Sequence, residues 1–107
     1  MDPECRIISK EILPAVRASV AQTMISEYNY CQREIAEKLG VVQVSVSKYI
    51  NKKYSKEISE IVGYIKGKRL EGKVIESIVS GKPTAEISEE LDSLCGEIAD
   101  SSYYKKI

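Results

Sequence analysis

The chain has 107 residues, with seven tyrosines and no phenylalanine, tryptophan or histidine, so aliphatic side chains must fill the core of a single domain. It contains no run of eighteen apolar residues, and its first ten residues lack the basic-then-apolar order of a signal peptide. These features exclude a membrane span and predict a cytoplasmic protein. The formal net charge is zero, but the segment 31–56 has six Lys/Arg and two Glu, whereas the segment 83–107 has six acids and two Lys. The local basic excess is compatible with a nucleic-acid partner, because phosphate contacts need a basic face rather than a basic protein.

Apolar residues recur at helical spacing in the first part of the chain and predict a long helix from about residue 3 to residue 27. These positions are Ile7, Ile8, Ile12, Leu13, Val16, Val20, Met24 and Ile25. Pro14 lies inside the segment and removes one backbone hydrogen bond, so we expect a kink or a break there.

The segment 32–51, QREIAEKLGVVQVSVSKYIN, has the pattern of a helix-turn-helix motif. Ile35 and Leu39 set the inward face of a first helix, with the small Ala36 where two helices must touch. Gly40 tolerates the left-handed conformation that ends a helix, and Val46 then lies on the inward face of a second helix. The outward residues of this second helix are polar: Gln43, Ser45, Ser47 and Lys48. They suit the major groove of DNA, although helical hairpins that bind no DNA share the pattern.

A basic loop and two more helices are expected after the motif. The segment 51–56, NKKYSK, contributes three lysines that would meet the DNA backbone. Ser55 is expected to cap a helix with apolar residues at 58, 61, 62 and 65, and an interruption is expected near Gly67. The following helix has apolar residues at 70, 74, 78 and 79 and ends at Gly81.

The last helix is expected to start at Pro83, with Thr84 as its cap, and it carries a regular apolar stripe on an acidic background. The stripe consists of Ile87, Leu91, Leu94, Cys95 and Ile98. It either closes the core of the monomer or forms a dimer seam. The regular spacing favours a dimer interface made by Ile87, Leu91, Leu94 and Ile98.

The three cysteines, Cys5, Cys31 and Cys95, are widely spaced and have no histidine to help them, so one chain cannot make a structural zinc site. They are either free thiols or partners in a disulfide, which could cross a dimer because their number is odd. No cofactor is expected. Nor is enzymatic activity, because no carboxylate pair lies beside a candidate nucleophile.

Segments inside the motif, and one segment before it, carry a resemblance to a known family. The sequences Leu13-Pro14-Ala15-Val16-Arg17-Ala18, Gln32-Arg33-Glu34-Ile35-Ala36, Leu39-Gly40-Val41, Val46-Ser47 and Tyr49 resemble archaeal predicted transcriptional regulators with a lambda-repressor/Cro-like (Xre-type) domain. That domain also occurs fused to a thiamine-phosphate-synthase-like domain, for which this chain has no room. The resemblance covers roughly residues 3–53.

The resemblance implies an all-α helix-turn-helix bundle that binds DNA, usually as a dimer on a partly palindromic site. By position, Gln32 would contact a phosphate, residues 43, 44 and 47 would face base edges, and residues 48 and 51–53 the backbone. The chain departs from the family at Cys31 and Val42, which replace capping hydroxyls. Glu34 is nevertheless where a capping box would place it. The family's paired C-terminal cysteines are reduced to Cys95-Gly96, so a metal or redox role there is not implied.

These observations predict an all-α bundle of about five to six helices, with a helix-turn-helix region in residues 1–56 and C-terminal helices in residues 57–107 that complete the bundle and dimerise. The predicted partner is double-stranded DNA, bound by a homodimeric transcription regulator; no small-molecule effector is identified. The predicted contact residues are Gln32, Arg33, Gln43, Val44, Ser45, Ser47, Lys48, Asn51, Lys52, Lys53 and Lys56. The alternatives are an architectural DNA-binding protein without strong sequence preference and a helical protein-interaction module.

Overall fold

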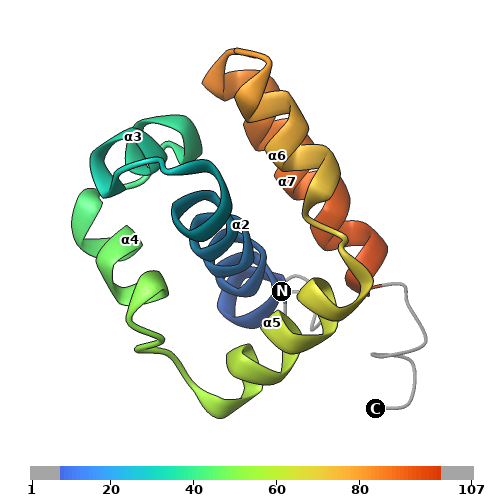
Figure 1. Cartoon of the computed structure of the whole chain (residues 1–107). Helices are drawn as coiled ribbons and strands as arrows, with labels where there is room; N and C mark the ends of the chain where they lie inside the picture. Colours follow the sequence, from blue (N-terminus) through green and yellow to red (C-terminus); the bar gives the residue numbers. More distant parts are fainter. Residues whose placement is uncertain (1–7, 100–107) are drawn as a thin grey trace.

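The computed structural model describes residues 8–99, and all of the regular structure in that range is helical (Figure 1). The elements are the π-helix η1 (Ile8–Ile12) and the α-helices α2 (Leu13–Tyr28), α3 (Gln32–Leu39), α4 (Gln43–Ile50), α5 (Lys56–Lys68), α6 (Gly72–Val79) and α7 (Thr84–Ala99). The prediction of an all-α bundle is confirmed. No helix in the described part is long and apolar enough to cross a membrane.

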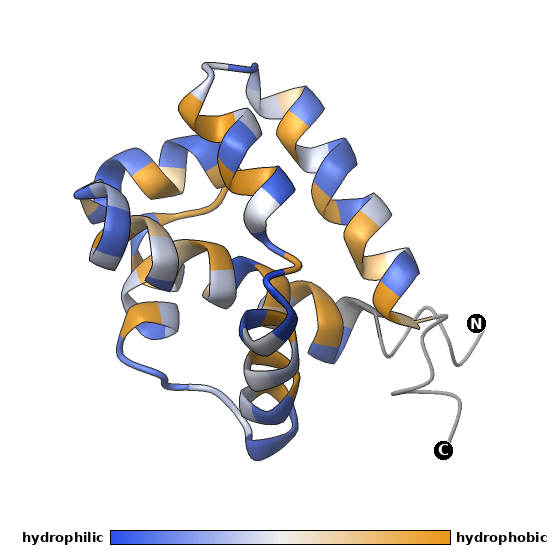
Figure 2. Ribbon diagram, turned by 45° about the vertical axis from the view of Figure 1, so that its right-hand side comes forward, coloured by the Kyte–Doolittle hydropathy of each residue, from blue (hydrophilic) through white to orange (hydrophobic). Residues whose placement is uncertain are grey.

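Helix α2 is the centre of the bundle, with α3 and α4 on one side of it and α6 and α7 on the other (Figure 1). It can contact every other helix because it is lined with small or apolar residues on all sides rather than on one stripe. Its buried residues are Ala15, Val16, Ala18, Ser19, Val20, Ala21 and Met24. The hydropathy colouring in Figure 2 shows the other helices presenting apolar residues in stripes, with hydrophilic residues between them.

The start of α2 differs from the expected long helix with a break at Pro14. A π-helical turn at residues 8–12 leads directly into α2, and Pro14 lies in the first turn of α2. Proline is tolerated there because the first amides of an α-helix have no intrahelical acceptor. The change from π-helix to α-helix at residue 13 therefore comes directly before Pro14. Residues 1–7 of the predicted helix lie outside the described residues.

One apolar core joins the helix-turn-helix region to the C-terminal helices, and the stripe of α7 belongs to it. The exposed fractions are 0% for Ile87, 2% for Leu91, 7% for Leu94 and 1% for Ile98. The prediction that these four residues form a dimer interface is therefore wrong. They close the monomer core against η1, α2, α3 and α6, which was the alternative left open by the sequence.

Cys95 is buried with the stripe and is a free thiol, and burial raises its pKa to about 11. It cannot reach a second chain in this conformation. Cys31 is a free thiol too, but it is exposed. Of the predicted disulfide partners, Cys5 lies outside the described residues.

The expected interruption near Gly67 is found: helix α5 ends at Lys68, and Arg69 takes the left-handed conformation with φ +54°. The expected cap of α7, in contrast, needs correction. Thr84 is not a helix cap: Pro83 O accepts the first amide hydrogen bonds of α7, and Thr84 Oγ1 donates to Glu37 O of α3 at 3.2 Å. Ser55 caps α5 as predicted, accepting from Ile58 N at 3.3 Å.

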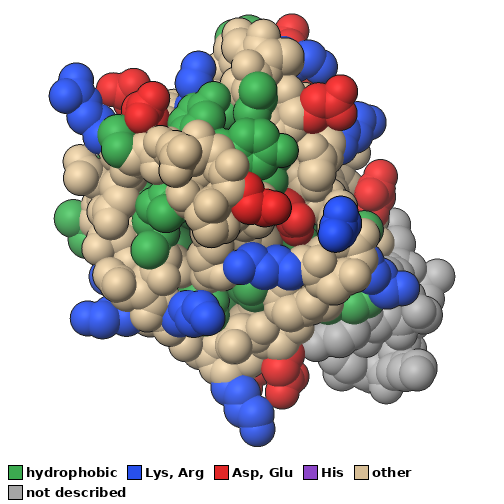
Figure 3. All heavy atoms as spheres, in the orientation of Figure 1, with side chains coloured by type: hydrophobic (Ala, Val, Ile, Leu, Met, Phe, Trp, Pro, Cys, Tyr) green, Lys and Arg blue, Asp and Glu red, His purple; other side chains and the backbone are tan. Residues whose placement is uncertain are grey.

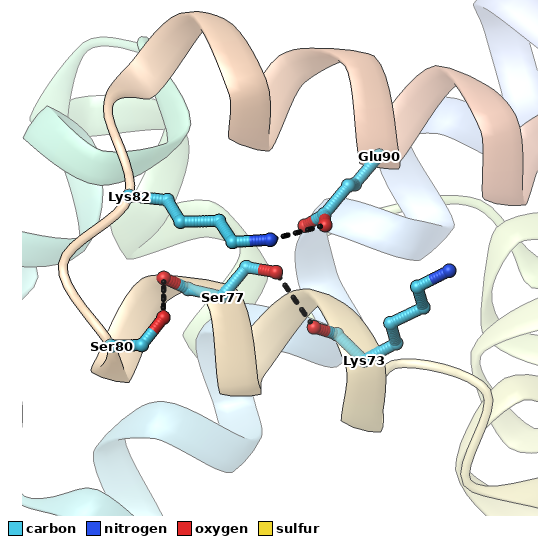
Figure 4. A network of polar contacts seen from close by, with 5 residues as sticks. All are labelled: Lys73, Ser77, Ser80, Lys82 and Glu90. Atoms are coloured by element: carbon cyan, nitrogen blue, oxygen red, sulfur yellow. Dashed lines mark hydrogen bonds and ion pairs between the residues drawn. The ribbon is translucent and has the colours of Figure 1, made fainter.

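Helices α6 and α7 form a hairpin that turns at Gly81, which has φ +87°. Figure 4 shows the polar contacts beside this turn. Lys82 Nζ lies 3.5 Å from Glu90 Oε1, so the ion pair ties the turn to α7. Within α6 and its end, Ser77 Oγ donates to Lys73 O and Ser80 Oγ to Ser77 O. These contacts lie on the side of the bundle away from α4 (Figure 1).

Candidate nucleic-acid interface

Helices α3 and α4 are joined by a turn of three residues, 40–42, and both pack against α2. Gly40 has φ +69° and ends α3, with Val41 N donating to Ala36 O at 3.0 Å. A Cβ atom on Gly40 would lie 3.3 Å from Thr84 Cγ2. Glycine is therefore required here for two reasons, the backbone conformation and the close approach of α7.

The first turn of α3 is capped by Glu34 rather than by a hydroxyl. Cys31 N donates to Glu34 Oε1 at 3.1 Å, and this hydrogen bond is the main reason why the pKa of Glu34 lies below its usual value. The reach of Glu34 back to the residue before the helix is the contact that a capping box predicts. Val42, at the start of α4, makes no side-chain cap hydrogen bond.

Helix α4 is held to the bundle by one fully buried side chain, Val46, and by the partly buried Tyr49 and Ile50. Gln43, Val44 and Lys48 are exposed. An α-helix with its side chains is about 10–12 Å across, which is similar to the width of the major groove of B-DNA.

The predicted contact residues all lie at or near the surface, and most belong to α4 and the loop after it. Eight are exposed: Arg33, Gln43, Val44, Lys48, Asn51, Lys52, Lys53 and Lys56. Three are half-buried: Gln32, Ser45 and Ser47. The predicted contact residues of the range 43–53 thus lie on α4 and the loop after it, while residues 32 and 33 lie in the first turn of α3 and residue 56 begins α5.

The charged side chains of α4 and the loop after it are all basic. The segment from Lys38 to Lys56 contains five lysines and no Asp or Glu. Figure 3 shows basic and hydrophobic side chains at the left and lower left of the molecule, where Figure 1 places α4 and the loop to α5. Arg33 adds less to this charge than the sequence suggests, since its Nε lies 3.7 Å from Glu37 Oε1 in an exposed ion pair.

The basic loop begins with a tight helix end. Lys53 N donates to Lys48 O at 2.9 Å and Lys52 N to Tyr49 O at 3.3 Å, while Lys52 takes φ +56°. This is the hydrogen-bond pattern of a Schellman motif, with a lysine where glycine is usual. It fixes the direction in which residues 52 and 53 leave α4.

Gln22, which the sequence analysis did not identify, fixes the end of α4 from the opposite side. Its Nε2 donates to Tyr49 O and to the hydroxyl of Tyr54, each at 2.9 Å, and its Oε1 accepts from Lys66 Nζ of α5. We call Gln22, Tyr49, Tyr54 and Lys66 the Gln22 cluster. The only sequence signal was a polar residue in the otherwise apolar centre of α2.

Lys66 links the Gln22 cluster electrostatically to the basic loop. Burial lowers the pKa of Lys66 below its usual value, and the positive charge of Lys52 lowers it further. Lys52 is therefore close enough for its charge to be felt at the cluster. The cluster supports the basic surface from behind.

The described part offers no cluster of candidate metal ligands at this surface. Among residues 8–99 there is no group of three or more His, Cys, Asp or Glu that could hold a metal ion. What the surface offers is hydrogen-bonding, apolar and cationic groups on a rigid helix, which is suited to recognition.

In the comparisons with known proteins, no family model matches the chain, and neither a curated protein nor a solved structure shows significant similarity to it.

Proposed function

We propose that this protein is a sequence-specific double-stranded DNA-binding transcription regulator, with α4 as its recognition helix. The observation that carries the proposal is the outward surface of α4 and the loop 51–55: it has no acidic side chain, it is fringed with lysines, and it is held rigidly by Val46 and the Gln22 cluster. The resemblance of residues 3–53 to Xre-type regulators supports the same function.

In this proposal the two kinds of side chain have different tasks. Lys48, Lys52 and Lys53 neutralise phosphates and set the register of the protein on the duplex, and Gln32 reaches a phosphate from the start of α3. Residues 43, 44 and 47 contact base edges in the major groove. An amide such as that of Gln43 can pair in bidentate fashion with adenine.

We further propose that the regulator acts as a homodimer on two half-sites, in the cytoplasm on the nucleoid. Since the apolar stripe of α7 is buried within the monomer, the dimer contact must use another surface. Two copies of α4 would then enter successive major grooves on one side of the duplex, about 34–36 Å apart.

Selection of binding sites from random duplex DNA with the full chain tests the function. An enriched motif with two half-sites, about 10 base pairs apart from centre to centre, is the expected result. Binding without an enriched motif would point to an architectural DNA-binding protein instead. Absence of binding even at low salt would contradict both and favour a protein-interaction module.

A further inference from the structure

The two most exposed large hydrophobic side chains of the described residues lie two positions apart at the start of α4. Val42 is 68% exposed and Val44 is 66% exposed, against 47% for Tyr28 and 48% for Val79. Single exposed apolar residues are common on protein surfaces. Val42 is the residue before α4, whereas Val44 lies on a helix surface that is otherwise polar and basic, which calls for a partner of mixed chemistry.

Val44 lies at the centre of the outward surface of α4. It is two residues before the buried Val46, which in an α-helix is a rotation of about 200°, so the two side chains point in nearly opposite directions. Lys48, two residues after Val46, shares this outward direction. Any molecule that lies along the outward surface of α4 must therefore cover Val44.

The polar groups beside Val44 are partly engaged with each other. Asn51 Nδ2 donates to Ser47 Oγ at 3.3 Å, one turn further along the same surface. The central contact that α4 offers, between Gln43 and Lys48, is thus apolar. A hydrogen-bond donor or acceptor on a base edge would lose water against Val44 without gaining a partner.

In the major groove, the thymine C5-methyl group is the apolar feature that base edges present. We propose that Val44 packs against a thymine methyl, so that α4 selects a thymine in each half-site. This inference rests on the proposed DNA-binding function and specifies its base preference. A protein partner is disfavoured by the surrounding lysines, because lysine is depleted in protein–protein interfaces.

Replacement of thymine by deoxyuridine tests the proposal, because it removes only the methyl group. Each thymine of the selected duplex is replaced in turn, and the Kd is measured by fluorescence anisotropy. Burial of one methyl group predicts a loss of affinity of about fourfold per half-site at one thymine position. In Val44→Ala, the difference between thymine and uracil at that position is expected to vanish.

Val79→Ala is the matched control, since it removes the same atoms from an exposed valine on α6 and should leave the fourfold difference intact. Equal affinity for thymine and uracil at every position, with the selected site still preferred, would overturn the inference and leave the proposed function standing. Persistence of the difference in Val44→Ala would also overturn it. Failure to bind any duplex would instead contradict the proposed function itself.

Discussion

Gly40 is subject to three constraints: it lies in the turn after α3, it lies close to α7, and its backbone is left-handed. Gly40→Ala places a Cβ atom in a left-handed conformation at φ +69° and 3.3 Å from Thr84 Cγ2. We expect it to lower the free energy of unfolding by about 1–2 kcal/mol, as measured by urea denaturation.

Gly63→Ala should change the free energy of unfolding in the opposite direction in the same experiment. Gly63 lies inside α5, and a Cβ atom there would meet nothing within 4 Å. The substitution should raise the free energy of unfolding by about 0.5–1 kcal/mol, because alanine loses less backbone entropy in a helix. If both variants were stabilised equally, the requirement for glycine at residue 40 would be disproved.

The effect on DNA affinity should depend on the DNA sequence when the side chain of Gln43 is removed, but not when that of Lys52 is removed. Gln43→Ala is expected to weaken binding to the preferred site by about 1–3 kcal/mol and to relax base preference, whereas Lys52→Ala should weaken all sequences by the same factor. Measured Kd values on the selected site and on an unrelated duplex separate the two. An unchanged Kd of Gln43→Ala on the preferred site would show that the register assigned to α4 is wrong.

Lys52→Ala is a clean removal of charge despite the unusual backbone at this residue. With φ +56°, lysine and alanine both carry the Cβ penalty of the left-handed region, so the substitution changes little in the helix end. A drop in stability larger than a few tenths of a kcal/mol would contradict this, and thermal unfolding of the free protein measures it.

Among the elements, α4 depends most on a contact from outside itself. Gln22→Ala removes the part-buried side chain that binds Tyr49 O, Tyr54 and Lys66. Loss of such partners typically costs about 1–3 kcal/mol. We expect this destabilisation together with faster amide hydrogen exchange at residues 52 and 53.

Ser26→Ala is a suitable control for Gln22→Ala. Ser26 lies one turn later on α2, and its Oγ donates to Gln22 O at an exposed position, so its removal should change stability by less than about 0.5 kcal/mol. Tyr54→Phe, which removes one of the three partners, should fall between them. If Gln22→Ala left the exchange at residues 52 and 53 unchanged, the Gln22 cluster would not be what orients the basic loop.

The helices could be predicted from the sequence because their apolar spacing is local, but several of their ends could not. In the described residues three helices end at non-glycine residues with positive φ: Asn29, Lys52 and Arg69. At Arg69 the cause is the next residue, since Leu70 must turn back to the core and its amide donates to Ile65 O at 3.0 Å. Residue propensity correctly predicted an interruption near Gly67, whereas the packing of Leu70 decides the residue at which the helix ends.

The outward-facing residues of α4 could be predicted in the same way, but the contacts that support the helix could not. Periodicity around Val46 indicates which side chains face outward, whereas the role of Gln22 depends on partners 27 to 44 positions away. Periodicity likewise predicted the apolar face of α7, but not what this face packs against, which is the rest of the same chain. Sequence patterns thus identify faces, while tertiary contacts decide what covers them.

At the scale of the whole molecule, the two charge excesses lie on different sides. Helix α4 and its lysines are separated by α2 from the acidic helix α7 (Figure 1), whose exposed acids are Glu86, Glu89, Asp92 and Glu97. This uneven charge distribution makes the neutral protein an electric dipole. Its field would orient the molecule with α4 toward a polyanion and α7 away from it.

The salt dependence of DNA binding tests this arrangement and the homodimer together. Each neutralised phosphate contributes about −0.9 to the slope of log K against log salt, so the lysines at 48, 52 and 53 predict a slope of about −3 for one protomer and about −5 for a dimer. Anisotropy titrations over a series of KCl concentrations measure it. Lys52→Ala should reduce the slope of the dimer by about 2, whereas Lys73→Ala, on α6, should not change it. A slope near −3, with a monomer mass in sedimentation of the complex, would contradict the homodimer, and a slope near zero would contradict phosphate binding by this surface.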